Sequence, residues 1–192
     1  QLNVIISEAD RLTALVSVLI RISQDEREER VYQAEPFDLE EMIREVVRRF
    51  AQTNPDYQIT CTIEGTPVVL ADRESIGQVL YNLISNAINY TGEDKRVFVA
   101  SKLIGTGVRV EIRDTGRGIP ADQLPLIWER YYRSRNTHQR PVAGSGLGLS
   151  IVKGALSAQN LPFGVDSVVG EGSCFWFELP FGALPSGREQ EN

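Results

Sequence analysis

The sequence predicts an α/β fold, a two-layer sandwich of a mixed β-sheet and helices, preceded by a long coiled-coil-type helix. Segments with a helical period alternate with pairs of short β-rich runs. Their order is helix, two strands, helix, two strands, a polar segment, helix, two strands. An apolar heptad pattern comes before them all. We therefore expect one layer of helices on one face of the sheet.

The composition is that of a soluble globular protein. The chain has 192 residues, of which 42% are hydrophobic and 24% are charged, enough for one ordinary domain and an extra helix. The net charge of -6 argues against general binding to nucleic acid. Cys61 and Cys174 each fall in a β-rich run, which favours reduced thiols over a disulfide or a metal site. We expect a cytoplasmic location, and the full-length protein is either anchored to a membrane or free.

Residues 1–31 form the first predicted unit, a helix followed by a charged linker. Its apolar positions are Leu2, Ile5, Ala9, Leu12, Val16 and Leu19. Such a stripe needs another helix to cover it, supplied by a missing segment, by a second copy of the chain or by the chain's own domain. Because the pattern is already under way at Gln1 without a cap, we expect a fragment of a longer protein.

The next predicted unit covers residues 32–181. Pro36 and Asp38 are helix start signals before the apolar face of residues 39–50. Short strands follow at 57–65 and 67–72, and a long helix at 73–90. This helix has an apolar side made of Ile76, Val79, Leu80, Leu83, Ile84 and Ala87.

The second half of this unit begins with two β-rich runs in residues 96–116. They join around residues 105–107, which is a hairpin signal. Residues 122–143 are polar and basic, and we expect a long mobile loop there. A helix is predicted over 149–156, with closing strands at 163–168 and 173–181. Residues 182–192 are expected to be a disordered tail.

Several polar residues lie on one face of the long helix, opposite its apolar side. Asn82, Asn86, Asn89 and Tyr90 are spaced by three and four residues or lie at the edge of that face. Amides there lower helix propensity and add nothing to a core. Asparagine oxygens suit Mg²⁺ that phosphate already partly neutralises. Taken alone, an ordinary exposed polar face explains them better.

A carboxylate surrounded by glycines follows the predicted hairpin. Asp114 ends a strand in the sequence RDTGRGIP and precedes Gly116 and Gly118. Such a carboxylate accepts a hydrogen bond from an exocyclic amine while the glycine backbone lies close to a flat ring. An ordinary turn uses the same residues.

Aromatic and basic residues come next, in IWERYYRSR. Ile127, Trp128, Tyr131 and Tyr132 form an apolar set, beside Arg130, Arg133 and Arg135. Arginine is well suited to phosphate oxygens. A short amphipathic helix with a solvated basic face is the alternative.

Glycines at every second position then lead into a helix, in GSGLGLSIVK. The spacing fits neither a P-loop nor a dinucleotide fingerprint. Glycines there allow backbone N–H groups to approach an anion at a helix start. A glycine-rich hinge is the alternative.

The order and spacing of these stretches resemble the ATP-binding catalytic domain of sensor histidine kinases, in the wider GHKL superfamily. The resemblance covers residues 37–181, and the heptad helix resembles the second helix of that family's dimerisation hairpin. It implies that Asn86, with Asn82 nearby, binds Mg²⁺, that Asp114 takes the adenine amino group, and that Tyr90 and Ile119 pack on the base. The other implied ATP contacts are Asn89, Gly116, Gly118, Tyr132, Gly144, Ser145, Gly146, Leu147, Gly148, Leu149 and Ser173. Arg130 and Arg133 are the candidates for the phosphates.

The resemblance also implies a reaction. Related ATPases usually carry a glutamate base four residues before the metal asparagine, where this chain has Asn82. An amide cannot take that proton, which favours phosphoryl transfer to an imidazole over hydrolysis. The only histidine is His138, in the predicted loop. The family's acceptor would lie before Gln1, so we expect binding of Mg·ATP without autophosphorylation.

The implied partners are ATP, the chain's own dimerisation helix, a second protomer and a response regulator receiver domain, with no nucleic acid. Two other functions stay open. One is a nucleotide-binding signalling module without transfer, which would bind ATP but not phosphorylate a restored acceptor helix. The other is a serine kinase of the anti-sigma-factor type, against which the heptad helix argues.

Overall fold

The computed structural model describes residues 31–130, 132 and 147–183, and the elements below belong to one compact unit that begins at Gln33. The heptad segment, residues 133–146 and the tail from residue 184 lie outside the described residues. The elements are β1 (Glu35–Asp38), α2 (Leu39–Thr53), β2 (Gln58–Ile63), β3 (Val68–Ala71), α3 (Arg73–Tyr90), β4 (Arg96–Ile104), β5 (Gly107–Asp114), α4 (Gly148–Ala158), β6 (Phe163–Val168) and β7 (Gly172–Pro180).

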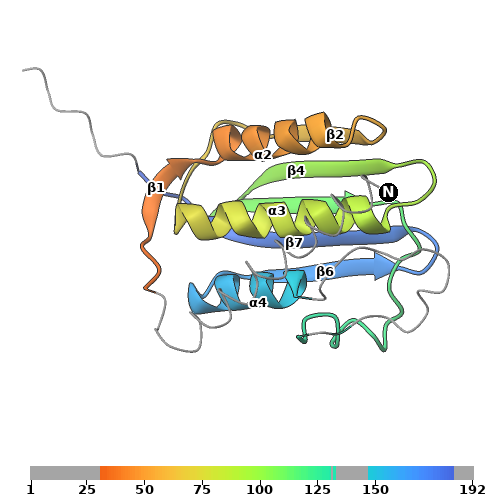
Figure 1. The fold of residues 1–192 in the computed structure, drawn as a ribbon. Helices are drawn as coiled ribbons and strands as arrows, with labels where there is room; N and C mark the ends of the chain where they lie inside the picture. Colours follow the sequence, from red (N-terminus) through yellow and green to blue (C-terminus); the bar gives the residue numbers. More distant parts are fainter. Residues whose placement is uncertain (1–30, 131, 133–146, 184–192) are drawn as a thin grey trace, which may run out of the picture. The chain divides into compact units, whose positions relative to one another are not determined.

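The main sheet has five strands in the order β2-β4-β5-β7-β6 (Figure 1). β2 runs parallel to β4, whereas the other neighbours are antiparallel. The sheet is therefore mixed, as predicted. The expected hairpin is confirmed, because Ile104 of β4 pairs with Gly107 of β5 across a tight turn.

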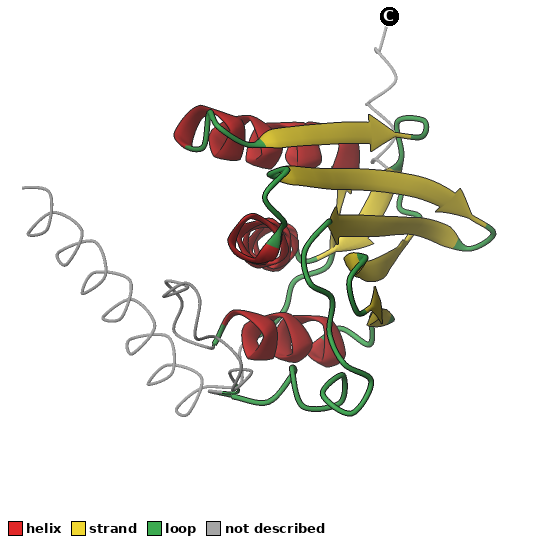
Figure 2. Ribbon diagram, turned by 90° about the vertical axis from the view of Figure 1, so that its right-hand side faces the viewer, coloured by secondary structure: helices red, strands yellow, loops and turns green. Residues whose placement is uncertain are grey.

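The described helices cover one face of this sheet, which confirms the two-layer architecture (Figure 2). The predicted apolar side of α3 is buried throughout, at 0 to 4% exposure. It packs in one core with alternate residues of the central strands, among them Val108, Val110, Phe177 and Leu179. Burial of this stripe, rather than helix propensity, fixes which face α3 turns to the cavity described below.

A small second sheet was not predicted. β1 pairs antiparallel with β3, although Pro36 and Asp38 had been interpreted only as helix start signals. Asp38 does cap α2, because its side chain accepts a hydrogen bond from the Glu41 N–H at 3.0 Å. Phe181, just after β7, bridges to Val69 of β3 as well. One short strand therefore contacts both ends of the domain.

A side-chain amide links the start of α3 to the end of α4. Gln159 accepts from the Asp72 N–H at 2.8 Å and donates to Ser75 Oγ at 3.1 Å. Asp72 is in turn the N-cap of α3, accepting from the Ser75 N–H at 2.8 Å. These bonds hold the two helices side by side.

The cysteines are free, as expected. Cys174 in β7 is buried, whereas Cys61 in β2 is half-buried. Burial raises the pKa of both thiols, so neither is an activated nucleophile. Among the described helices, none combines the length and the apolar character that a membrane crossing requires.

Candidate functional site

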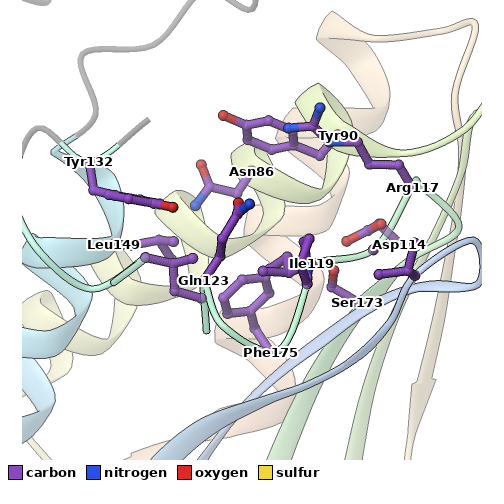
Figure 3. Close-up of a pocket in the computed structure, with 14 residues that line it drawn as sticks. Asn86, Tyr90, Asp114, Arg117, Ile119, Gln123, Tyr132, Leu149, Ser173 and Phe175 are labelled. Atoms are coloured by element: carbon purple, nitrogen blue, oxygen red, sulfur yellow. The ribbon is translucent and has the colours of Figure 1, made fainter. Parts of the chain in front are cut away.

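A cavity of about 260 Å³ opens beside the C-terminal half of α3 (Figure 3). Its walls come from α3, the end of β5, the segment that follows β5, the first turn of α4, and β7. The lining residues are Asn86, Tyr90, Asp114, Arg117, Gly118, Ile119, Pro120, Gln123, Ile127, Tyr132, Leu149, Val169, Ser173 and Phe175. Residues predicted from four separate stretches thus meet in one place.

Asp114 is the buried acid of this cavity, with 3% of its surface exposed. It ends β5 on the side of the strand that faces the core, after Val108, Val110 and Ile112. Burial raises the pKa of its carboxyl group, while backbone N–H groups of Gly116 and Ser173 oppose this rise by donating to it. The Gly116 bond measures 2.8 Å to Oδ1. These donors leave the carboxylate room for a further partner from the cavity.

Glycines around Asp114 allow neighbouring backbone segments to approach more closely than a side chain would permit. A Cβ on Gly116 would lie 1.9 Å from the Tyr90 carbonyl oxygen, and one on Gly172 would lie 2.1 Å from that of Asp114. Gly118 has φ +70°, and a Cβ there would lie 2.1 Å from the Val168 carbonyl oxygen. The end of β5 is thereby pressed against α3 on one side and the β6–β7 turn on the other.

Two hydroxyl groups continue the polar floor of the cavity. Ser167 and Ser173, on β6 and β7, place their Oγ atoms 3.0 Å apart. Ser167 accepts from the Ile119 N–H at 2.8 Å and donates to the Gly172 carbonyl at 2.9 Å. Because Ser167 already uses its proton on Gly172, the Ser173 hydroxyl donates to Ser167 or to a ligand.

The asparagines of α3 differ in their surroundings. Asn86 lines the cavity, Asn82 lies one turn away, and Asn89 is exposed outside it. Asn82 Oδ1 accepts from Gln78 at 3.3 Å, while its Nδ2 is buried with no hydrogen-bond partner among the described residues. A Cβ on Gly148 would lie 3.8 Å from Asn86 Oδ1 and 3.9 Å from Asn82 Oδ1. The start of α4 therefore lies over both amides.

Apolar groups form the rest of the wall. Ile119, Ile127, Leu149 and Phe175 line it, and Tyr90 stands at the mouth with 41% exposure. Trp128 supports this wall from behind, with its ring 5.0 Å from that of Phe163 and 5.8 Å from that of Phe175, both edge-on. The cavity thus combines flat apolar surfaces with a few fixed polar groups, which suits a planar ligand.

Not every predicted site residue lines the cavity. The cavity is not lined by Asn82, Asn89, Gly116, Leu147 or Gly148. Arg130 does not line it either and is exposed. Arg133, Gly144, Ser145 and Gly146 lie outside the described residues, as does His138.

The cavity is also lined by residues that were not predicted, namely Arg117, Pro120, Gln123, Val169 and Phe175, and by Ile127, for which no binding role was expected. Phe175 carried a usable signal, since it alternates with Ser173 along β7. Gln123 and Val169 sit in turns and carried none.

The described residues contain no group of three or more His, Cys, Asp or Glu side chains placed to hold a metal ion.

The sequence matches a known family over residues 71–183, the family described as histidine kinase-, DNA gyrase B-, and HSP90-like ATPase. The signal transduction histidine-protein kinase ArlS of Staphylococcus haemolyticus is 30% identical over 175 residues, which are 91% of this chain and 39% of that protein. The chain thus spans less than half of this relative.

Two solved structures share the architecture. ShkA in complex with AMPPNP aligns with a TM-score of 0.79 and 28% identity, covering 94% of this chain and 38% of that one. Histidine kinase ThkA in complex with response regulator protein TrrA aligns with a TM-score of 0.71 and 29% identity, covering 93% and 49%.

Proposed function

Because the chain belongs to the histidine kinase-, DNA gyrase B-, and HSP90-like ATPase family and carries the catalytic ATPase domain of a two-component sensor histidine kinase, we propose that its cavity binds Mg·ATP and directs the γ-phosphoryl group to a histidine. The observation that carries this proposal is the buried carboxylate of Asp114 in a cavity with apolar walls. The AMPPNP in the ShkA complex supports the same ligand class.

The adenine would lie at the Asp114 end. Its exocyclic amine donates to the free position of the carboxylate, and Ser173 offers a hydroxyl beside it. Ile119 and Tyr90 pack on the faces of the base, and Gly118 lines the same end of the cavity. The adenine amino group is what this end selects, because a carboxylate repels a ligand that presents a carbonyl oxygen there.

The other end fits a phosphate chain with Mg²⁺. The Nδ2 of Asn82 is buried without a hydrogen-bond partner among the described residues, and it can donate to an anion. Asn86 lines the cavity and presents a neutral oxygen, which suits a hard cation. Asn86, with Asn82 nearby, would hold the ion, and the ion would supply positive charge that offsets the charge of the phosphates. Arg130 and Arg133, together with the backbone at Gly144, Ser145, Gly146, Leu147 and Gly148, are proposed to contact the phosphates from the loop.

The acceptor is proposed to be a histidine on a dimerisation helix that the 192 residues do not include, since His138 is the single histidine. In the transfer, the imidazole nitrogen forms the new bond to phosphorus as the bond to ADP breaks.

Residues 1–31 would be the partial dimerisation helix and linker, and residues 32–181 the catalytic domain. A second protomer and a response regulator receiver domain are proposed as partners, by analogy with the ThkA complex. We place the reaction in the cytoplasm, where ATP and reduced cysteines such as Cys61 and Cys174 both occur.

The decisive experiment is a titration of a fluorescent ATP analogue into the protein with and without Mg²⁺. We expect binding that Mg²⁺ strengthens, and a loss of at least about tenfold in affinity for Asp114→Asn, because the amide presents a donor to the adenine amine. Asp56→Asn is the matched control, since that carboxylate is 80% exposed on a turn and does not line the cavity. Failure of the wild-type protein to bind would refute the proposal.

Transfer is tested separately. The protein is mixed with radiolabelled ATP alone and with a dimerisation helix that carries a histidine. Acid-labile label should appear only on the added helix. Label on a serine of a protein acceptor, or none at all beside normal ATP affinity, would replace the kinase assignment by one of the two alternative functions.

A further inference from the structure

Gln123 is a polar residue of the cavity that has no assigned role. It lies in the turn after Pro120, and its backbone is fixed there, since its N–H donates to the Pro120 carbonyl at 2.9 Å. Its own carbonyl accepts from Leu126 at 2.9 Å and from Ile127 at 3.2 Å. The side chain is half-buried and lines the cavity, where Figure 3 shows it pointing toward the region of Asn86.

The amide of Gln123 has no hydrogen-bond partner among the described residues, and neither has that of Asn86. Partly buried amides normally hydrogen-bond to protein, water or ligand. Two such groups, one from α3 and one from the turn, face the same cavity. Their free donors and acceptors point to a polar part of a ligand rather than to the apolar base.

The same end of the cavity favours an anion. Leu149, in the first turn of α4, lines it, and Gly148 lies next to Asn86. Leu147 is the N-cap of α4 and provides no side-chain cap, so the first N–H groups of this helix have no side-chain acceptor there. The helix dipole adds partial positive charge. At the opposite end lies the carboxylate of Asp114, which disfavours an anion.

We propose that Gln123 is a phosphate-binding residue, whose side-chain N–H donates to a phosphate oxygen of the bound adenine nucleotide. This inference rests on the proposed function and adds one contact to it, from the turn rather than from α3 or α4. It predicts that Gln123 separates ligands by their phosphates: nucleotides gain the contact, whereas the nucleoside adenosine does not.

The test is an NMR titration of the ¹⁵N-labelled protein with ADP and, at millimolar concentration, with adenosine. The Gln123 side-chain amide resonance is assigned through bonds and followed directly. We expect it to shift with ADP and not with adenosine. In Gln123→Leu, ADP affinity should fall by about tenfold and adenosine affinity should stay within about twofold. Gln123→Glu should weaken ADP further, because its carboxylate repels phosphate.

Gln52→Leu is the matched control, since Gln52 is exposed on α2. An unshifted Gln123 amide in wild-type protein that binds ADP overturns this inference and leaves the proposed function intact. An equal loss of ADP and adenosine affinity in Gln123→Leu overturns it too. If the wild-type protein binds neither ligand, both proposals fail. The direct resonance decides the matter even if Gln123→Leu folds poorly.

Discussion

Replacing Gly116 by alanine should both destabilise the fold and abolish nucleotide binding. The new Cβ would lie 1.9 Å from the Tyr90 carbonyl oxygen and 2.8 Å from Asp114 Oδ1. An ordinary contact begins at 3.4 Å, so the loop and the end of α3 must separate by roughly 1.5 Å in a close-packed interior. Because the Tyr90 carbonyl oxygen belongs to the backbone, no change of side-chain rotamer relieves the clash.

The expected magnitude follows from this overlap. Overpacking of this size costs about 2 kcal/mol or more of unfolding free energy. For a domain of this size, that lowers the melting temperature by about 4–8 °C. The 2.8 Å bond from the Gly116 N–H to Asp114 is disturbed at the same time, so the carboxylate leaves its position for the adenine amine.

Two assays measure these effects. Unfolding is followed by the fluorescence of Trp128 and Trp176, and binding by the ATP-analogue titration. Gly154→Ala is the control, because nothing lies within 4 Å of a Cβ at this exposed site of α4, and it should stabilise the protein by about 0.5–1 kcal/mol. If Gly116→Ala melts within about 1 °C of the wild type and binds ATP equally well, the close-approach argument is wrong.

Three further outcomes are expected. Gln159→Leu should lower the unfolding free energy by about 1–2 kcal/mol in urea titrations, because the Asp72 N–H and the Ser75 hydroxyl lose their partner; unchanged stability would contradict this. Burial raises the pKa of Asp114, so the protonated carboxyl group favours the folded state. This contribution to stability is fully present below the unfolded-state pKa and is lost as the pH rises through the folded-state pKa. The stability of Asp114→Asn relative to wild type should therefore increase in thermal melts as the pH rises above the unfolded-state pKa of about 4, and a flat difference would rule the effect out. Trp128→Ala should cost about 3 kcal/mol because it removes ring contacts to Phe163 and Phe175, whereas Trp128→Phe should cost under half of that in the same melts.

The helices and most strands could be predicted because each carries its own pattern. The apolar stripe of α3 and the alternation in β5 and β7 are local signals that the core then enforces. β1 was missed because four residues have too little periodicity, and its partner β3 lies about 30 residues later. The position of β2 at the edge, parallel to β4, depends on the path of α3 and on no local residue pattern.

The candidate site also has residues that a local sequence pattern predicts and residues that none does. Asp114, Asn86 and Ser173 could be found because their residue types are unusual for a strand end, a helix face and a buried strand. Gln123 could not, since a glutamine in a turn is ordinary, and only the folded turn brings it into the cavity. Asn89 fits the helical spacing as well as Asn86 does, but in the folded protein it is exposed and does not line the cavity.

The pairing of β3 with both ends of the domain has a consequence for chain connectivity. Val69 lies between Phe37 on one side and Phe181 on the other. These ends are therefore two strand spacings apart, about 10 Å, a gap that a linker of about four to six residues crosses. A circular permutant could join residue 183 to residue 34 and open at Thr106, in the exposed β4–β5 turn. Every strand pairing is kept in such a chain, so the topology of this fold does not require that its synthesis begin at β1.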